Sequence, residues 1–270
     1  MQSSLATLLK DDRDSTPLTG AALIDRLIED WPDLDAAQLT VEEEREPGTL
    51  ALRYAGTAIA VSVVPSPLDA DLDALAAGSG QWPATVAPPH ECTAFVVVAV
   101  LDADERGTHR DALARAVLLS RTIASMLHLD ESLRAVFWSA ADQLIHPANF
   151  LEQAGRLPAP MPASWVAITV GPRQDGTVGG YSRGLGMLGL LDLELPSIDE
   201  TEDQVFDRLV GLALHQLERG PVLGDGETIA GPAGDVMVVR HTESADGAGR
   251  PVARLTPVPQ RRRGLFGRRR

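Results

Sequence analysis

The segment that most limits what this chain can fold into is CTAFVVVAVL, residues 92–101. It is apolar or β-branched almost throughout, whereas a strand with one face in water alternates apolar and polar residues. We therefore expect residues 92–101 to form an inner strand of a sheet that is covered on both faces. The apolar run within it, Phe95 to Leu101, is far shorter than the roughly 20 residues that a membrane-spanning helix needs.

The patterns elsewhere predict an α+β protein with a mixed or antiparallel β-sheet covered by helices. Apolar residues recur at helical spacing in residues 20–30, 108–128 and 201–218, and each of these segments begins beside a threonine that can cap a helix. Two alternating runs, residues 49–54 and 57–64, predict a β-hairpin. Further strands are expected at 38–44, 133–138, 164–170, 190–195, 236–241 and 251–255, and further helices at 68–77 and 140–155.

The composition also suggests where the chain divides. Residues 1–16 are polar and rich in aspartate, so we expect a flexible leader. The main α+β domain is expected over residues 17–258, and the proline-rich stretch RLPAPMP (156–162) predicts two packed lobes within it. These lobes would span residues 17–158 and 163–256. Residues 259–270 predict a disordered tail rich in arginine.

Charge is unevenly distributed along the chain. The formal net charge of all 270 residues is −14, and the last ten, RRRGLFGRRR, hold six arginines and no acid, which leaves −20 on the rest. A body this acidic repels nucleic acid and anionic lipid, so we regard nucleic acid as an unlikely partner. The same charge can steer a basic protein toward the body.

Cysteine content and the N-terminal sequence narrow the cellular setting. Cys92 is the only cysteine, which excludes an internal disulfide and any zinc or iron–sulfur site built from several cysteines. The N-terminal residues show neither a basic start nor an apolar stretch of signal-peptide length. We therefore expect a cytoplasmic protein.

One motif raises the alternative of a serine hydrolase. Gly180 to Gly184 matches G-x-S-x-G, the turn that presents a nucleophilic serine, and Asp225 and His241 follow Ser182 in the order that α/β-hydrolases use. In this alternative Ser182 is the nucleophile, His241 the base and Asp225 the acid that orients it. A strong strand should precede the motif and a helix should follow it, yet neither pattern is present. We therefore assign no catalytic residue, and interpret the segment as a glycine-rich hairpin.

Cofactor and metal motifs are incomplete as well. Gly184-x-Gly186-x-x-Gly189 matches the dinucleotide fingerprint, but no helix is predicted to begin after Gly189, so we predict no bound cofactor. Asp69-x-Asp71-x-Asp73 resembles the start of a calcium loop without its later ligands. The six histidines are scattered along the chain with no pair at i, i+4, and we predict no metal site.

Several short signatures together resemble the bacterial family known as domain of unknown function 4261. They are the VVVAVL strand with the helix that ends near Ile123-Ala124, Ala135 to Trp138, Pro147 to Phe150, Trp165 to Ile168, the set Ser182, Gly184, Leu185, Gly189 and Asp192 to Glu194, and Gly220 to Ile229. The resemblance would span about residues 20–240. Ser182 stands where the family has threonine, and the arginine-rich tail is a second departure. The resemblance implies no assigned activity, and it implies a structural role for the glycine-rich segment.

From these observations we expect a non-enzymatic cytoplasmic binding protein, with an adaptor or immunity-like role, whose acidic body engages a protein partner. The serine hydrolase is the alternative. The tail adds a second expectation, because arginines near an anionic leaflet each contribute about 1 kcal/mol and an apolar pair between them can enter the interface. The residues expected to contact such a surface, at the inner face of the membrane, are Arg261, Arg262, Arg263, Leu265, Phe266, Arg268, Arg269 and Arg270.

Overall fold

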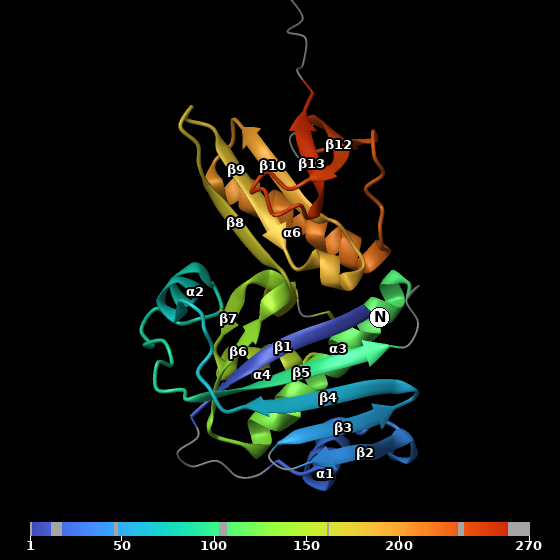
Figure 1. The fold of residues 1–270 in the computed structure, drawn as a ribbon. Helices are drawn as coiled ribbons and strands as arrows, with labels where there is room; N and C mark the ends of the chain where they lie inside the picture. The colour runs from blue at the N-terminus through green and yellow to red at the C-terminus, as the bar shows by residue number, and fades with distance from the viewer. Residues whose placement is uncertain are drawn as a thin grey trace, which may run out of the picture.

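A computed structural model describes residues 2–11, 18–45, 48–102, 107–160, 162–231 and 235–258. The chain forms two β-sheets, one above the other in Figure 1, with helices packed behind each. This arrangement confirms the predicted α+β class with mixed and antiparallel sheets covered by helices.

The first sheet has seven strands, all paired antiparallel, in the order β2-β3-β4-β5-β1-β6-β7. Their bounds are β1 (Gln2–Lys10), β2 (Leu39–Arg45), β3 (Thr49–Tyr54), β4 (Thr57–Val64), β5 (Ala94–Asp102), β6 (Leu133–Trp138) and β7 (Gln143–Ile145).

The second sheet has six strands in the order β11-β12-β13-β10-β9-β8, and its one parallel pair joins β10 to β13. Their bounds are β8 (Ala167–Pro172), β9 (Val178–Arg183), β10 (Asp192–Ile198), β11 (Thr228–Ala230), β12 (Val236–Glu243) and β13 (Pro251–Pro257).

Six α-helices and three short 3₁₀ helices belong to the described residues. The α-helices are α1 (Gly20–Asp30), α2 (Leu72–Gly78), α3 (His109–Leu129), α4 (Pro147–Ala154), α5 (Pro162–Trp165) and α6 (Glu202–Arg219), and the 3₁₀ helices are η2 (Ala36–Gln38), η3 (Ser139–Ala141) and η4 (Leu185–Leu188). The three helices that were expected to begin beside a threonine, α1, α3 and α6, are capped by it. Thr19, Thr108 and Thr201 each accept a hydrogen bond from a backbone N–H of the first turn.

The prediction of a flexible leader over residues 1–16 is wrong for its first part. Residues 2–10 form β1, which lies between β5 and β6 and pairs with β5 along its whole length. Leu8 is fully buried, and the Lys10 ammonium, itself buried, forms an ion pair with Asp130 at 3.1 Å. The segment is short and partly polar, so only its long-range partners reveal that it is a central strand. Residues 12–16 lie outside the described residues.

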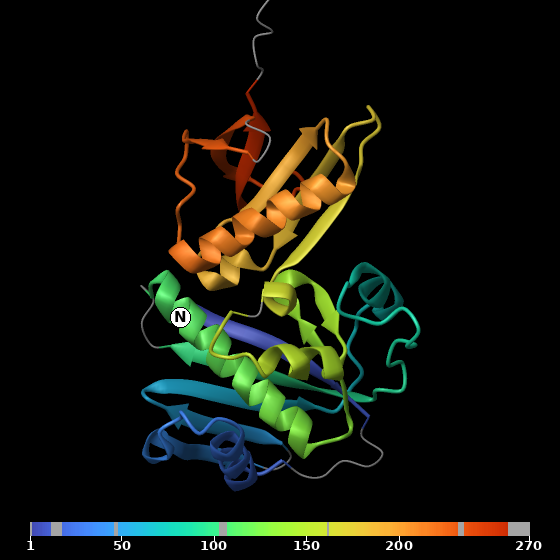
Figure 2. The same cartoon turned by 180° about the vertical axis from the view of Figure 1, so that it is seen from behind.

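One face of the first sheet is covered by α1, α3 and α4, as seen from behind in Figure 2. The residues of β5 that point to this side, Val96, Val98 and Val100, are at most 2% exposed. By length and composition α3 could cross a membrane, but most of it is buried inside the protein as the central core helix. Behind this face lies the largest cluster of buried side chains.

The opposite face of the first sheet corrects the expectation that β5 is covered on both sides. Figure 1 shows no helix in front of β3, β4 and β5; only the β6–β7 end lies under α2 and the loop after it. There Leu9, Ala135 and Leu144 pack with Trp82 and Cys92 in a second, smaller core. The remaining part of this face has no helix over it, and its mostly apolar side chains are partly buried by their neighbours in the sheet.

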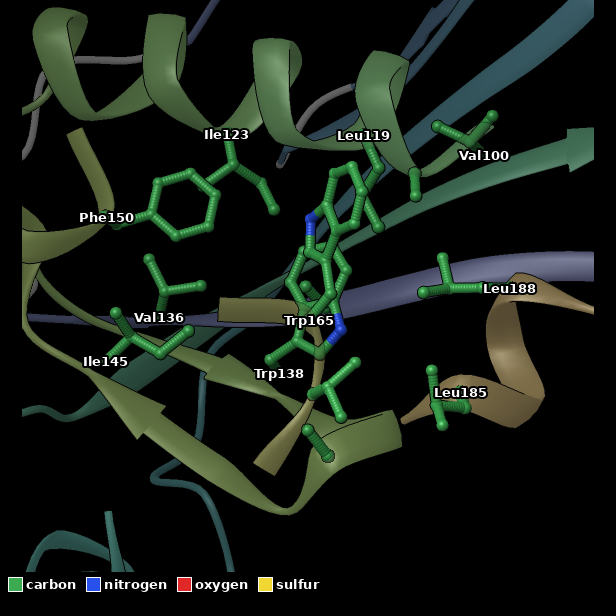
Figure 3. Close-up of a cluster of buried hydrophobic side chains, with 14 of the residues drawn as sticks. Val100, Leu119, Ile123, Val136, Trp138, Ile145, Phe150, Trp165, Leu185 and Leu188 are labelled. Atoms are coloured by element: carbon green, nitrogen blue, oxygen red, sulfur yellow. The ribbon is translucent and has the colours of Figure 1, made fainter. Parts of the chain in front are cut away.

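The second sheet packs against the first through one continuous core. Figure 3 shows Trp138 and Trp165, both fully buried, beneath α3 and beside Leu185 and Leu188 of η4. The indole N–H of Trp165 donates to the Ser120 hydroxyl of α3 at 2.9 Å. The predicted boundary at 156–162 falls between α4 and α5, where the chain passes from the first sheet to the second. Its behaviour as a lobe boundary stays a prediction, for which limited proteolysis is the measurement.

Two local assignments differ from the sequence patterns. Residues 140–155, predicted as a helix interrupted at Pro147, form part of η3, then β7, and then α4, which begins at that proline. Residues 164–170, predicted as a strand, begin in the short helix α5 and continue as β8. Residues 164–170 are too few for their periodicity to separate a helix from a strand, whereas Pro147 starts a helix because its missing N–H is not needed in the first turn.

Candidate interaction surface

The motif serine is a buried structural group. Ser182 lies within β9 and is 3% exposed. Its hydroxyl donates to Asp192 Oδ1 at 3.1 Å and accepts from the backbone N–H of Leu193 at 2.8 Å, so it holds β9 against β10. A nucleophile elbow instead places its serine on an exposed turn between a strand and a helix.

The proposed partners of Ser182 lie elsewhere in the sheet. His241 belongs to β12, and β10 and β13 lie between it and β9, which separates the two residues by about 14 Å at 4.8 Å per strand. The His241 ring nitrogen Nε2 donates to the carbonyl of Leu223 at 2.6 Å, and its backbone N–H donates to Asp225 Oδ1 at 2.9 Å. The structure thus brings Asp225 next to His241, and brings neither to Ser182.

Asp192 anchors the glycine-rich turn. Its Oδ1 also accepts the backbone N–H of Leu185 at 3.0 Å, and burial raises the pKa of this carboxyl despite those hydrogen bonds. Gly184 has a φ of +113°, and a Cβ at that position would lie 2.0 Å from the carbonyl oxygen of Trp165. The glycine is therefore required by the close approach of the end of β9 to α5, and this packing explains its place in both motifs.

Neither the metal motifs nor the tail adds to a site in the described structure. Among the described residues, no group of three or more His, Cys, Asp or Glu side chains is placed to hold a metal ion. Every tail residue proposed to contact an anionic surface lies outside the described residues. These are Arg261, Arg262, Arg263, Leu265, Phe266, Arg268, Arg269 and Arg270.

The part of the first sheet that no helix covers is the candidate interaction surface of the described chain; its side chains are partly exposed, except for Thr7 and Ala99, which are 6% and 9% exposed. We call it the open face, and define it by nine residues whose side chains share one side of β1, β3, β4 and β5. They are Leu5, Thr7, Ala51, Ala58, Ala60, Ser62, Val97, Ala99 and Leu101. None of them carries a charge.

The register of the strands aligns these residues in rows. Leu5, Ala99, Ala60 and Ala51 are successive cross-strand partners and form one row over four strands. The nine positions, about 6.8 Å apart along the strands and about 4.8 Å apart across them, cover about 290 Å² of the sheet. The largest apolar patch of a typical soluble monomer is of about this size, and such patches are often binding sites.

Among the residues that the structure describes, charged side chains stand at the border of the open face. On the β2–β3 side, Arg53 donates to Glu42 at 2.5 Å and 3.0 Å, and Glu43 forms an ion pair with Arg45. On the other side, Asp73 of α2 is largely exposed and contacts His90 at 3.2 Å. The surface is thus a flat, uncharged centre of small side chains with a charged rim.

Sequence reasoning missed this surface, although part of its signal is visible. Apolar residues on both faces of 95–101 suggest full burial, and the second face of the 57–64 strand carries Ala58, Ala60 and Ser62 before Val64. Small uncharged residues at the solvent positions of a strand are the signal that could have found it, because water-facing positions usually carry larger polar groups.

Comparisons with known proteins reach only the second sheet. Residues 181–256 match the model of a family described as Domain of unknown function (DUF4261). The match confirms the resemblance and runs from β9 through β13, which is a smaller part than the expected span of residues 20–240. No curated protein and no solved structure matches the chain significantly.

Proposed function

Starting from a chain whose residues 181–256 resemble a family without an assigned activity, we propose that this protein is a non-enzymatic adaptor or immunity-like protein that docks a protein partner on its open face. The single observation that supports this function is the uncovered apolar face of β1, β3, β4 and β5. Apolar side chains in contact with water raise the free energy of the unbound protein. A partner that covers them removes this unfavourable contribution.

The expected affinity follows from the area. Burying at most about 290 Å² of mostly apolar surface contributes at most about 7 kcal/mol on this side of the interface, at about 25 cal/mol per Å². Association costs about 4 to 15 kcal/mol in lost freedom of motion. Because the gain and the cost are of similar size, contacts at the charged rim decide whether the complex is stable.

Charge selects the kind of partner. The formal net charge is −14, and β2, at the edge of the first sheet, carries Glu42, Glu43 and Glu44 in succession. We therefore propose a partner whose docking element is apolar at its centre and carries lysine or arginine around it. Attraction between these charges raises the association rate at low salt, and added salt weakens it.

The test compares two arginine substitutions of alanine. Ala60→Arg places a charge in the centre of the open face, whereas Ala37→Arg changes an exposed alanine of η2 outside it. Proteins captured from native cells by the wild-type chain are purified, and their dissociation constants for all three chains are measured. Urea unfolding confirms that both variants fold.

We expect at least one captured basic protein to bind the wild type and Ala37→Arg equally, and to bind Ala60→Arg at least tenfold more weakly. A charge buried without a partner in an apolar interface has this effect. Equal binding of every captured protein to Ala60→Arg and to the wild type contradicts the proposal.

A further inference from the structure

A groove of about 630 Å³ lies between α6 and β11, in the second sheet rather than at the open face. Figure 2 shows α6 lying across the back of this sheet, and β11 is one of its two edge strands. Residues of α6 line one side of the groove, and Ile229, Ala230 and Gly231 line the other. Leu212 and Ile229 also pack against the core, so part of the groove is apolar.

The charge of the groove is negative. Among the described residues that line it, Arg208 is the one cation, and it already pairs with Glu200 and, at 3.1 Å, with Asp235. Asp207 lines the groove as well, is exposed, and forms no ion pair with any described residue. Two acids thus offset Arg208, and a third carboxylate is in contact with water and open to a cation.

The edge of β11 adds backbone groups that a bound chain can use. Gly231 donates its N–H to the carbonyl of Asp235 at 2.7 Å, and residues of an antiparallel strand alternate between bonding to the partner strand and pointing away from it. Ala230, the next residue along the strand, therefore directs its N–H and C=O away from β12. An extended segment beside β11 can bond to these groups as an added strand.

The described part of the chain ends close to this groove. Val258 donates its N–H to the carbonyl of Val236 at 2.8 Å, and Val236 is the cross-strand partner of Ala230. Val258 and Ala230 are thus two strand spacings apart, which is about 10 Å. Leu265 and Phe266 follow Val258 by seven and eight residues in the sequence, and seven residues can span about 25 Å. Both side chains are therefore within reach of the groove.

We propose that this groove binds the segment RRRGLFGRRR of the same chain, residues 261–270. Leu265 and Phe266 pack against its apolar part, and the arginines on either side of them pair with the carboxylates, a combination that guanidinium groups favour. Because the segment is tethered, its local concentration at the groove is on the order of 1 mM, so that a weak affinity is enough. An anionic membrane attracts the same arginines, so the groove and the membrane compete for them.

Disulfide formation in the full-length chain tests this proposal. Gly211→Cys places a thiol in the groove, where a Cβ meets nothing within 4 Å, and Gly264→Cys places a second thiol beside Leu265. The matched control combines Gly264→Cys with Phe206→Cys, because Phe206 is 47% exposed on the same helix and does not line the groove. A glutathione redox buffer measures the effective concentration of each pair of thiols. Mass spectrometry of peptides identifies the bonded pair and distinguishes it from a bond to the buried Cys92.

We expect the effective concentration of the 211/264 pair to exceed that of the 206/264 pair at least tenfold. Adding Asp207→Arg should lower it at least threefold, because this change replaces the exposed carboxylate by a charge that repels the segment. Asp203→Arg makes the same change at an exposed acid of α6 that does not line the groove, and should lower it less than twofold. High salt should weaken the preference for the groove.

The proposal is overturned if the 211/264 and 206/264 pairs have equal effective concentrations, or if the disulfides join different molecules, since the groove would then hold the segment of a second copy. An effect of Asp207→Arg that is no larger than that of Asp203→Arg also rejects it. Circular dichroism before oxidation establishes that each variant is folded. Should Phe206→Cys fail to fold, Leu214→Cys takes its place, because Leu214 is 38% exposed on α6 and also lies outside the groove.

Discussion

Replacing Gly184 by alanine should destabilise the protein strongly, and the structure gives the size of the effect. The residue has a φ of +113°, a conformation that costs an L-residue about 1 to 3 kcal/mol. The new Cβ would also lie 2.0 Å from the carbonyl oxygen of Trp165, a residue that is fully buried and hydrogen-bonded to Ser120. Relieving such overpacking costs about 1 to 3 kcal/mol more.

The sum is about 4 kcal/mol, which is a large part of the roughly 5 to 15 kcal/mol that stabilises a typical domain. Urea unfolding followed by tryptophan fluorescence measures it, because Trp138 and Trp165 lie in the core between the sheets. Gly186→Ala is the control from the same segment, since a Cβ there meets nothing within 4 Å. We expect that variant to stay within about 0.5 kcal/mol of the wild type.

The reasoning is refuted if Gly184→Ala unfolds within about 1 kcal/mol of the wild type, a loss no larger than that of an average substitution. In that case the close approach of β9 to α5 would not be what demands glycine. If urea unfolding shows a large loss of stability in Gly184→Ala, packing alone explains the glycine of the G-x-S-x-G motif, without reference to catalysis.

Three further outcomes are expected. Burial raises the pKa of Asp192, so this group stabilises the fold below pH 3.8 and loses that contribution as the pH rises through its folded-state pKa. Asp192→Asn should therefore melt at a higher temperature than the wild type at pH 7, with the difference shrinking toward pH 3; a difference that is constant with pH contradicts this. A fluorophosphonate probe should leave Ser182 unlabelled in the folded protein, and labelling that Ser182→Ala abolishes would revive the hydrolase alternative. The full chain should co-sediment with anionic but not neutral vesicles and lose this binding in high salt and on deletion of 261–270; equal sedimentation of the truncated chain rejects a membrane role for the tail.

The candidate sites were only partly visible in the sequence. The apolar pattern of residues 92–101 identified an inner strand. Whether one face of that strand stays uncovered depends on where the helices pack. The Ser182, Asp225 and His241 order was visible, but it had no bearing on their distance in space.

What the sequence determined by itself is the local structure whose causes lie within a few residues. The helix of residues 20–30 was predicted at its observed bounds, and the hairpin of 49–54 and 57–64 likewise, because a capping threonine or a tight turn and the apolar spacing act over short range. Only the tertiary structure decided that Gln2–Lys10 is a central strand and that β10 and β13 separate Ser182 from His241. It also decided that no helix covers the open face. The physical reason is that the pairing of strands and the covering of a sheet by helices depend on contacts between residues far apart in the chain. The local periodicity of a segment does not show which distant segments compete for its edges and its apolar face.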